Sequence, residues 1–151
     1  MTVTVAKDGQ LAYDMAQLQG DIAAASAISD VLTVDGDNLT SAGDVTVGNF
    51  LTMADGGELT ISGGVVTATA SLHNIDTEGD AASDNLDTIN GAATGRILII
   101  RSTSGARDII VKDATGNLFL AGDCTLGVIN DRLMIIGRDA NWFEVSRSIN
   151  G

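Results

Sequence analysis

Residues 91–151 read GAATGRILIIRSTSGARDIIVKDATGNLFLAGDCTLGVINDRLMIIGRDANWFEVSRSING, and this stretch decides the fold class. Short apolar runs recur in it about every ten residues, at 97–100, 109–111, 118–120, 133–136 and 142–145. The clusters between the runs are rich in Gly, Asn and Asp. These residues favour turns, because Gly tolerates positive φ and Asn and Asp hydrogen-bond to their own backbone. Evenly spaced short strands joined by turns are typical of antiparallel sandwiches and barrels, so the stretch predicts an all-β fold.

Residues 32–70 carry a short repeat ahead of that stretch. An aliphatic residue, a Thr and usually another apolar residue recur in the tripeptides at 32–34, 39–41, 45–47, 51–53, 59–61 and 66–68. Strands this short, with so few large side chains, cannot bury a core alone. They are typical of chains wound around symmetry mates or stacked as a solenoid, as in viral fibre shafts. The alternative is a plain β-meander that belongs to the C-terminal sandwich.

The N-terminal segment has a different pattern. Residues 3–5 read as one short strand, and the residues that follow are rich in Ala, Gln, Met and Ile. Apolar residues at Leu11, Met15, Leu18 and Ile22 are spaced by 4, 3 and 4 residues, which is the seam that helices bury against one another. A helix packed on its own domain, a trimeric bundle and an extended arm on a neighbouring subunit all fit this pattern.

An acidic connector, SLHNIDTEGDAASDNLDTINGAATG, occupies residues 71–95. We expect no strong strand in it and a short helical turn around 85–89. Together the patterns divide the chain into an N-terminal arm or short helix at 1–31, a short-strand repeat at 32–57 and a jelly-roll β-sandwich at 58–151.

The composition indicates a thin core. The 151 residues include no Pro, 18 Gly and few aromatic side chains (one Trp, one Tyr and three Phe). Small and β-branched residues must therefore do most of the packing, and such segments often need a partner. We expect self-association rather than a self-sufficient monomer.

The net charge of −12 is concentrated in residues 1–95, which hold 14 acids and one base, whereas residues 96–151 hold six acids and seven bases. Contacts to phosphate need Lys and Arg, so we expect no binding to nucleic acid or to an anionic membrane surface. We also expect no membrane-spanning run and no signal peptide. Solvated acidic loops explain the charge most simply; attraction to a basic partner surface is the alternative.

Residues that could carry chemistry are few. Asp76, Glu78 and Asp80 alternate as calcium ligands do, but Ala81 stands where an EF-hand-like loop needs Gly, so we prefer a solvated loop. The single histidine and the single cysteine, Cys124, give neither a nucleophile with its base in a recognisable context nor a metal cluster. Cys124 is expected to be a small buried hydrophobe. We therefore expect no enzyme, no cofactor and no metal.

Trp142 opens the last apolar run after a predicted hairpin at 137–141. We expect its indole to cover one end of the sandwich rather than to form a platform for a sugar ring.

A resemblance to a known family rests on several of these features. The segment SDNLDTI at 83–89, Gly91 and Gly95, the buried strand that follows, and the closing NWFEV at 141–145 resemble a recurrent module of tailed-bacteriophage structural proteins. The resemblance covers roughly residues 58–151. In that family the module is a small jelly roll, found in homotrimeric capsid decoration (cement) proteins and in tail-fibre or receptor-binding tips.

The resemblance implies a structural protein on the surface of a phage head, assembled in the host cytoplasm as a homotrimer that binds the major capsid protein and stabilises the capsid. The chain is short for the long shaft of a fibre, which favours this role over the alternative, a tail-fibre or receptor-binding tip that recognises host surface glycan. Under this hypothesis the N-terminal segment and the repeat make the trimer or capsid contacts. The residues expected there are Leu11, Met15, Leu18, Ile22, Leu51 and Met53.

Overall fold

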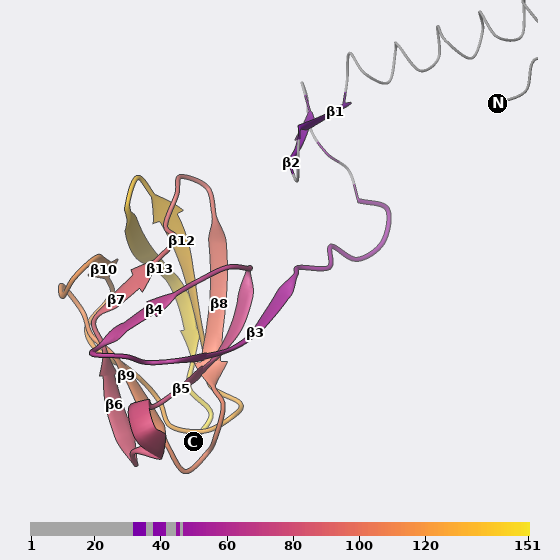
Figure 1. Ribbon diagram of the computed structural model, residues 1–151. Coiled ribbons are helices and arrows are strands. Elements are labelled where there is room, and N and C mark those ends of the chain that lie inside the picture. The colour runs from indigo at the N-terminus through magenta and orange to yellow at the C-terminus, as the bar shows by residue number, and fades with distance from the viewer. Residues whose placement is uncertain (1–31, 36–37, 42–44, 46) are drawn as a thin grey trace, which may run out of the picture. The chain divides into compact units, whose positions relative to one another are not determined.

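The computed structural model describes residues 32–35, 38–41, 45 and 47–151, which belong to two compact units that meet in sequence between Leu51 and Thr52 (Figure 1). The first unit contains an antiparallel hairpin of β1 (Leu32–Asp35) and β2 (Asn38–Ser41). The predicted seam of Leu11, Met15, Leu18 and Ile22 lies outside the described residues.

The second unit consists of strands and one short 3-10 turn. They are β3 (Asp55–Thr60), β4 (Val65–Thr67), β5 (Leu72–Asp76), η1 (Glu78–Asp80), β6 (Ser83–Leu86), β7 (Thr88–Asn90), β8 (Ile97–Ser102), β9 (Asp108–Val111), β10 (Leu118–Phe119), β11 (Cys124–Leu126), β12 (Arg132–Arg138) and β13 (Asn141–Ser148). The predicted all-β class is confirmed for the described residues. All five apolar runs identified after residue 95 form strands: β8, β9, β10, β12 and β13.

The first strands of this unit are wound in parallel (Figure 1). β3, β5 and β8 are successive neighbours in one sheet and pair in parallel. β4 pairs in parallel with β7, and β6 pairs in parallel with β9. The chain therefore returns to the same sheets in the same order, which is a solenoid-like arrangement. Each strand finds its partner one coil further along the chain, because the strands next to it in sequence lie in other sheets.

The last strands reverse this direction and close the winding. β12 pairs antiparallel with β8, β13 antiparallel with β12, and β11 antiparallel with β9. The main sheet has the order β10-β13-β12-β8-β5-β3. The predicted hairpin at 137–141 is confirmed: Arg138 pairs with Asn141, and Asp139 in the turn has a φ of 57°.

The jelly-roll part of the fold prediction is not confirmed. A jelly roll is built from antiparallel strands, whereas the ladders among β3, β5 and β8, between β4 and β7, and between β6 and β9 are parallel. Turn-separated short strands with a buried side are common to both architectures. The spacing that indicated a sandwich therefore describes the strands correctly and says nothing about their direction of pairing.

Two expectations for the connector are wrong. β5, β6 and β7 lie within residues 71–95, where no strong strand was expected, and the helical turn falls at Glu78–Asp80 rather than around 85–89. β6 has the sequence SDNL, which has low intrinsic strand propensity. Its pairing with β9 holds it in an extended conformation. A prediction from local sequence does not include that partner, because β9 lies more than twenty residues further along the chain. The tripeptide at 51–53, expected to be a strand, is not one.

The core lies between the sheets of the second unit. Its buried members are Ile61, Val66, Ile75, Leu86, Ile89, Leu98, Ile100, Ile109, Val111, Leu118, Cys124, Leu126, Leu133, Ile135 and Trp142. Nearly all are aliphatic, as the composition predicted. Every strand of the second unit except β3 contributes at least one of them.

The side chain of Asn117, the residue before β10, joins this part of the chain to β7. Its Oδ1 accepts a hydrogen bond from the N–H of Ile89 (3.0 Å), and its Nδ2 donates to the carbonyl of the same residue (2.9 Å). Nδ2 also donates to the carbonyl of Ala140 (3.0 Å). The side-chain amide thus replaces a backbone peptide beside β7.

Asp131 organises the turn before β12 and the C-terminal end of the chain. The buried carboxylate accepts hydrogen bonds from the N–H groups of Gly127 (2.8 Å), Val128 (3.1 Å) and Asn150 (2.6 Å). Burial alone would raise the pKa of Asp131, but these three N–H groups and the nearby Arg132 hold the pKa below its ordinary value of 3.8. The charged form is therefore the one that the fold stabilises.

The lowered pKa of Asp131 predicts how its contribution depends on pH. A carboxyl group whose pKa is lower in the folded state contributes stability above its unfolded pKa and loses it as the pH falls through the folded value. We expect Asp131→Asn to destabilise the protein by about 1–3 kcal/mol at pH 7, because the amide leaves buried N–H groups without an acceptor. The difference between wild type and variant should shrink below about pH 4. Urea unfolding of both proteins at several pH values measures it, and a difference independent of pH would contradict it.

Candidate functional site

His73 is a structural residue. It is only 2% exposed. Its Nε2 accepts hydrogen bonds from the N–H groups of Thr69 and Ala70 (3.1 Å each), and its Nδ1 lies 3.1 Å from the carbonyl oxygen of Gly57. A carbonyl can only accept, so Nδ1 carries the proton, and the neutral ring has both nitrogens engaged. No ring nitrogen is left for proton transfer to a substrate.

Cys124 lies in the core, in agreement with the prediction. It belongs to β11 and pairs with Val111 of β9. Burial raises the pKa of its thiol, although the neighbouring Arg147 acts in the opposite direction. A thiol with a raised pKa stays protonated at neutral pH and is a poor nucleophile.

Trp142 is a core residue rather than a sugar platform. Its side chain is 1% exposed, and its Nε1–H donates a hydrogen bond to the carbonyl of Ile89 (2.8 Å). The indole therefore packs inside the second unit, with its polar group satisfied.

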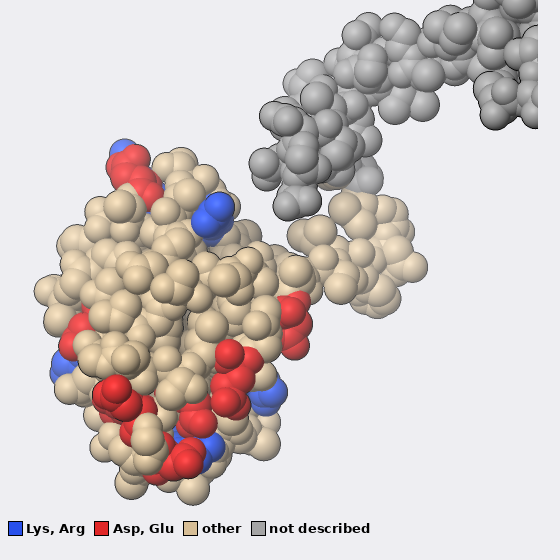
Figure 2. Space-filling model, in the orientation of Figure 1, with Lys and Arg blue, Asp and Glu red and all other residues tan. Residues whose placement is uncertain are grey.

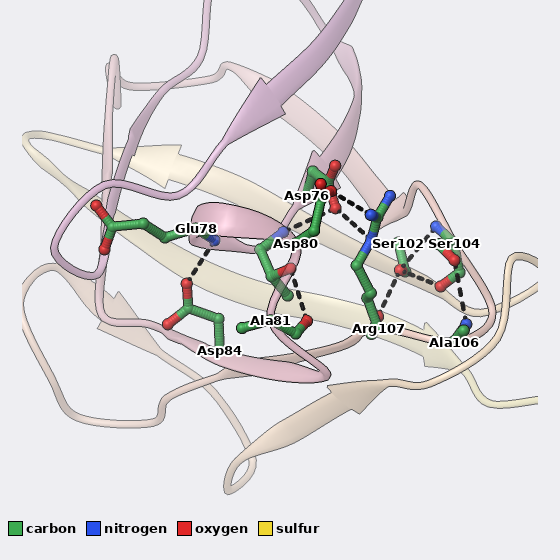
Figure 3. A network of polar contacts seen from close by, with 10 residues as sticks. Asp76, Glu78, Asp80, Ala81, Asp84, Ser102, Ser104, Ala106 and Arg107 are labelled. Atoms are coloured by element: carbon green, nitrogen blue, oxygen red, sulfur yellow. Dashed lines mark hydrogen bonds and ion pairs between the residues drawn. The ribbon is translucent and has the colours of Figure 1, made fainter.

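The carboxylates of the acidic segment bind partners within the protein (Figure 3). Asp76 and Asp80 both form ion pairs with Arg107, with Asp76 Oδ1 2.9 Å from the Arg107 Nε. Asp84 accepts a hydrogen bond from the N–H of Glu78 (2.9 Å). Within the part of the chain that the structure describes, no group of three or more His, Cys, Asp or Glu side chains could hold a metal ion. Residues 76–84, which run from the end of β5 through η1 into β6, are thus braced by ion pairs and hydrogen bonds.

This brace extends into the loop that follows β8. Ser102 is buried, and its Oγ contacts the carbonyls of Ser104 (2.7 Å) and Arg107 (2.9 Å), which fixes the turn that carries the Arg107 guanidinium (Figure 3). In the view of Figure 2, acidic side chains gather toward the lower end of the second unit, while much of the surface above them carries few charges.

Part of the outer face of the main sheet is apolar, and this part is the candidate functional site. Successive side chains along a strand alternate between the outer face and the core, as the burial pattern of β8 shows. Apolar residues on adjacent strands also lie directly opposite one another: Ile97 pairs with Ile136, Ile136 with Phe143, and Phe143 with Phe119. We call the following seven residues the apolar face: Leu72, Ile97, Ile99, Phe119, Met134, Ile136 and Phe143.

The aromatic pair is the most accessible part of the apolar face. Phe119 and Phe143 stack with ring centroids 5.1 Å apart and an angle of 14° between the ring planes. Their exposed fractions are 45% and 36%, and that of Ile136 is 38%. Large apolar side chains that adjoin one another on a surface mark interaction sites, whereas isolated ones do not.

A groove continues the apolar face toward the β12–β13 hairpin. It has a volume of about 400 Å³ and is lined by Thr94, Gly95, Ile136, Gly137, Arg138 and Phe143. The apolar face is thus shaped as well as hydrophobic, and it offers room for a side chain from a partner.

Of the residues predicted to make trimer or capsid contacts, the structure describes two. Leu51 is 71% exposed and Met53 is half-buried. Neither belongs to a strand, and neither belongs to the apolar face. Their predicted role stays a prediction.

Sequence reasoning missed the apolar face, although a signal was present. The runs ILII at 97–100 and LMII at 133–136 are apolar at consecutive positions, whereas a strand with one solvated face alternates apolar and polar residues. Consecutive apolar residues in an exposed sheet indicate a face that a partner covers.

Comparisons with known proteins identify no relative: no family model, no curated protein and no solved structure matches this chain. Among the described residues, no helix is long and apolar enough to cross a membrane.

Proposed function

We propose that the chain is a structural protein of a bacteriophage virion: a homotrimeric decoration protein that binds the major capsid protein and stabilises the capsid. The observation that carries this proposal is the apolar face. Burying apolar surface gains about 25 cal/mol per Å², so a continuous apolar sheet face favours association strongly. We propose that other copies of the same chain cover this face. The strands carry few large side chains, so packing one sheet against another adds buried apolar surface.

The chemistry of the second unit supports a role in holding rather than in catalysis. His73 has both ring nitrogens engaged, the Cys124 thiol is buried, and the carboxylates Asp76 and Asp80 are paired with Arg107. These groups maintain the fold itself. The resemblance in sequence to phage decoration modules supports threefold symmetry, and the association needs only an outer sheet face, which a solenoid-like unit supplies as well as a jelly roll does.

A tail-fibre or receptor-binding tip is the second candidate. The solenoid-like winding of β3 to β9 favours it, because short-stranded solenoids are typical of viral fibre shafts. The two roles differ in the target: a decoration protein binds phage heads, whereas a fibre tip binds host cells.

Association through the apolar face is tested by the mass of the native particle. We expect wild type to show three times the chain mass of 15.4 kDa in light scattering after size exclusion. Phe143→Glu should shift the particle toward a single chain with an unchanged circular dichroism spectrum, because a buried charge without a partner opposes association. Ile149→Asp is the matched control, since Ile149 is exposed but lies outside the apolar face.

A wild type that stays monomeric at about 100 µM, a concentration that suffices for associations with micromolar dissociation constants, would contradict the trimer. If Phe143→Glu and Ile149→Asp lowered the particle mass equally, the interface would lie outside the apolar face. The virion role has its own measurement, cosedimentation with isolated undecorated heads compared with host cells. Binding to heads supports decoration, binding to cells supports the fibre tip, and binding to neither contradicts both.

A further inference from the structure

The outer surface of the main sheet carries a second, polar region next to the apolar face. It is a pocket of about 330 Å³, lined by Asp55, Leu72, His73, Asn74, Ile99, Ile100, Arg101 and Arg132. Leu72 and Ile99 belong to both regions. The chemistry of the pocket is set by Asp55, Asn74, Arg101 and Arg132. The ring nitrogens of His73 are already engaged, as described above.

Two arginines lie at neighbouring positions in this pocket. Leu133 pairs with Ile100 in an antiparallel register, so Arg132, one residue before Leu133, falls opposite Arg101, one residue after Ile100. Like charges that face each other directly across two strands are destabilising. Neither arginine takes part in any of the ion pairs among the described residues. Within the described part of the chain, these two adjacent cations are therefore not used in ion pairs.

Both guanidinium groups are held in place along one edge. Arg101 Nε donates to Asn74 Oδ1 (2.5 Å), and Asn74 is also its partner in the β5–β8 register. Arg132 Nη1 donates to the carbonyls of Ile129 (2.6 Å) and Asp131 (2.8 Å). A guanidinium has five N–H donors in a planar fork, so each arginine keeps further donors for another group. Such a fork matches the two oxygens of a carboxylate.

The other lining residues narrow the class of ligand. Asp55 lines the same pocket, and its negative charge repels a dianion more strongly than a monoanion, which disfavours phosphate. Asp55 Oδ1 accepts a hydrogen bond from the N–H of Gly57 (2.9 Å), and the carboxylate can accept further hydrogen bonds from hydroxyl groups. The volume falls within the range of small-molecule pockets. We propose that this pocket binds a small polyhydroxylated carboxylate, that is, an acidic monosaccharide such as a hexuronic acid.

This site goes beyond the proposed function and is tested separately from it. Isothermal titration of the full chain with glucuronate should show saturable binding with a dissociation constant of about 1 mM or below, and glucose, which lacks the carboxylate, should not bind. Arg101→Ala should weaken glucuronate binding about tenfold or more, because a charge-assisted hydrogen-bonded pair is lost. Arg101→Lys keeps the charge without the fork and should also weaken it. Arg96→Ala is the matched control, because Arg96 is exposed and lines neither this pocket nor the groove beside the apolar face.

Three results would overturn the site: no heat of binding at about 10 mM glucuronate, equal binding of glucose, or tighter binding of inorganic phosphate than of glucuronate. Unchanged binding in both Arg101 variants would overturn the assignment of the pocket. The particle mass, measured on the same sample, reports the trimer independently. Glucuronate binding by a monomer would leave this site standing while the trimer fails.

Discussion

Trp142→Ala is expected to lower the free energy of unfolding by about 3–5 kcal/mol. Trp142 is the largest fully buried side chain of the core, so its removal leaves a cavity that the surrounding aliphatic residues can fill only in part. The substitution also removes the hydrogen bond from Trp142 Nε1 to the carbonyl of Ile89. That carbonyl keeps its second bond, from Asn117 Nδ2, so the main loss is in packing.

Phe143→Ala is the matched control for the loss of Trp142. Phe143 is the next residue of β13 and faces outward, stacked on Phe119. We expect Phe143→Ala to change the stability of the single chain little and to weaken association instead. Urea unfolding under conditions that keep the chain monomeric measures the first effect, and light scattering measures the second. A Trp142→Ala variant as stable as Phe143→Ala would contradict the position assigned to the indole.

Gly116→Ala is expected to cost about 2–5 kcal/mol, from two separate effects. Gly116 has a φ of +56°, and the left-handed conformation costs an L-residue about 1–2 kcal/mol. A methyl group there would also meet the backbone carbonyl of Asp87 and the Oγ1 of Thr88. Forcing backbone atoms apart in a packed region typically adds about 1–3 kcal/mol. The same shift would move Asn117, whose side chain bonds to Ile89 of β7.

Gly63→Ala separates the two effects. Gly63 has a φ of +57°, nearly the same as Gly116, but no atom lies within 4 Å of the position that its methyl group would take. We expect Gly63→Ala to cost only the conformational part, about 1–2 kcal/mol. Thermal unfolding of the two variants beside wild type gives the difference. Equal destabilisation by the two substitutions would show that the close approach between Gly116 and β7 contributes nothing to the cost of Gly116→Ala.

The candidate site was predictable only in part. The burial of Cys124 was predicted from the sequence, and the structure confirms it. The arginine pair was not predicted. Arg101 and Arg132 lie far apart in sequence and become neighbours only through the register of β8 and β12. No local pattern contains that register.

The sequence by itself determined the class of fold and most of the strands in its last third. Apolar runs separated by Gly, Asn and Asp fold as short strands and turns whatever their partners are. Only the tertiary structure decided that β3, β5 and β8 pair in parallel. The alternation of side chains along a strand is the same for parallel and antiparallel ladders. The direction of pairing depends on which strand, distant in sequence, lies beside each strand in the sheet. The packing of the whole core determines that neighbour.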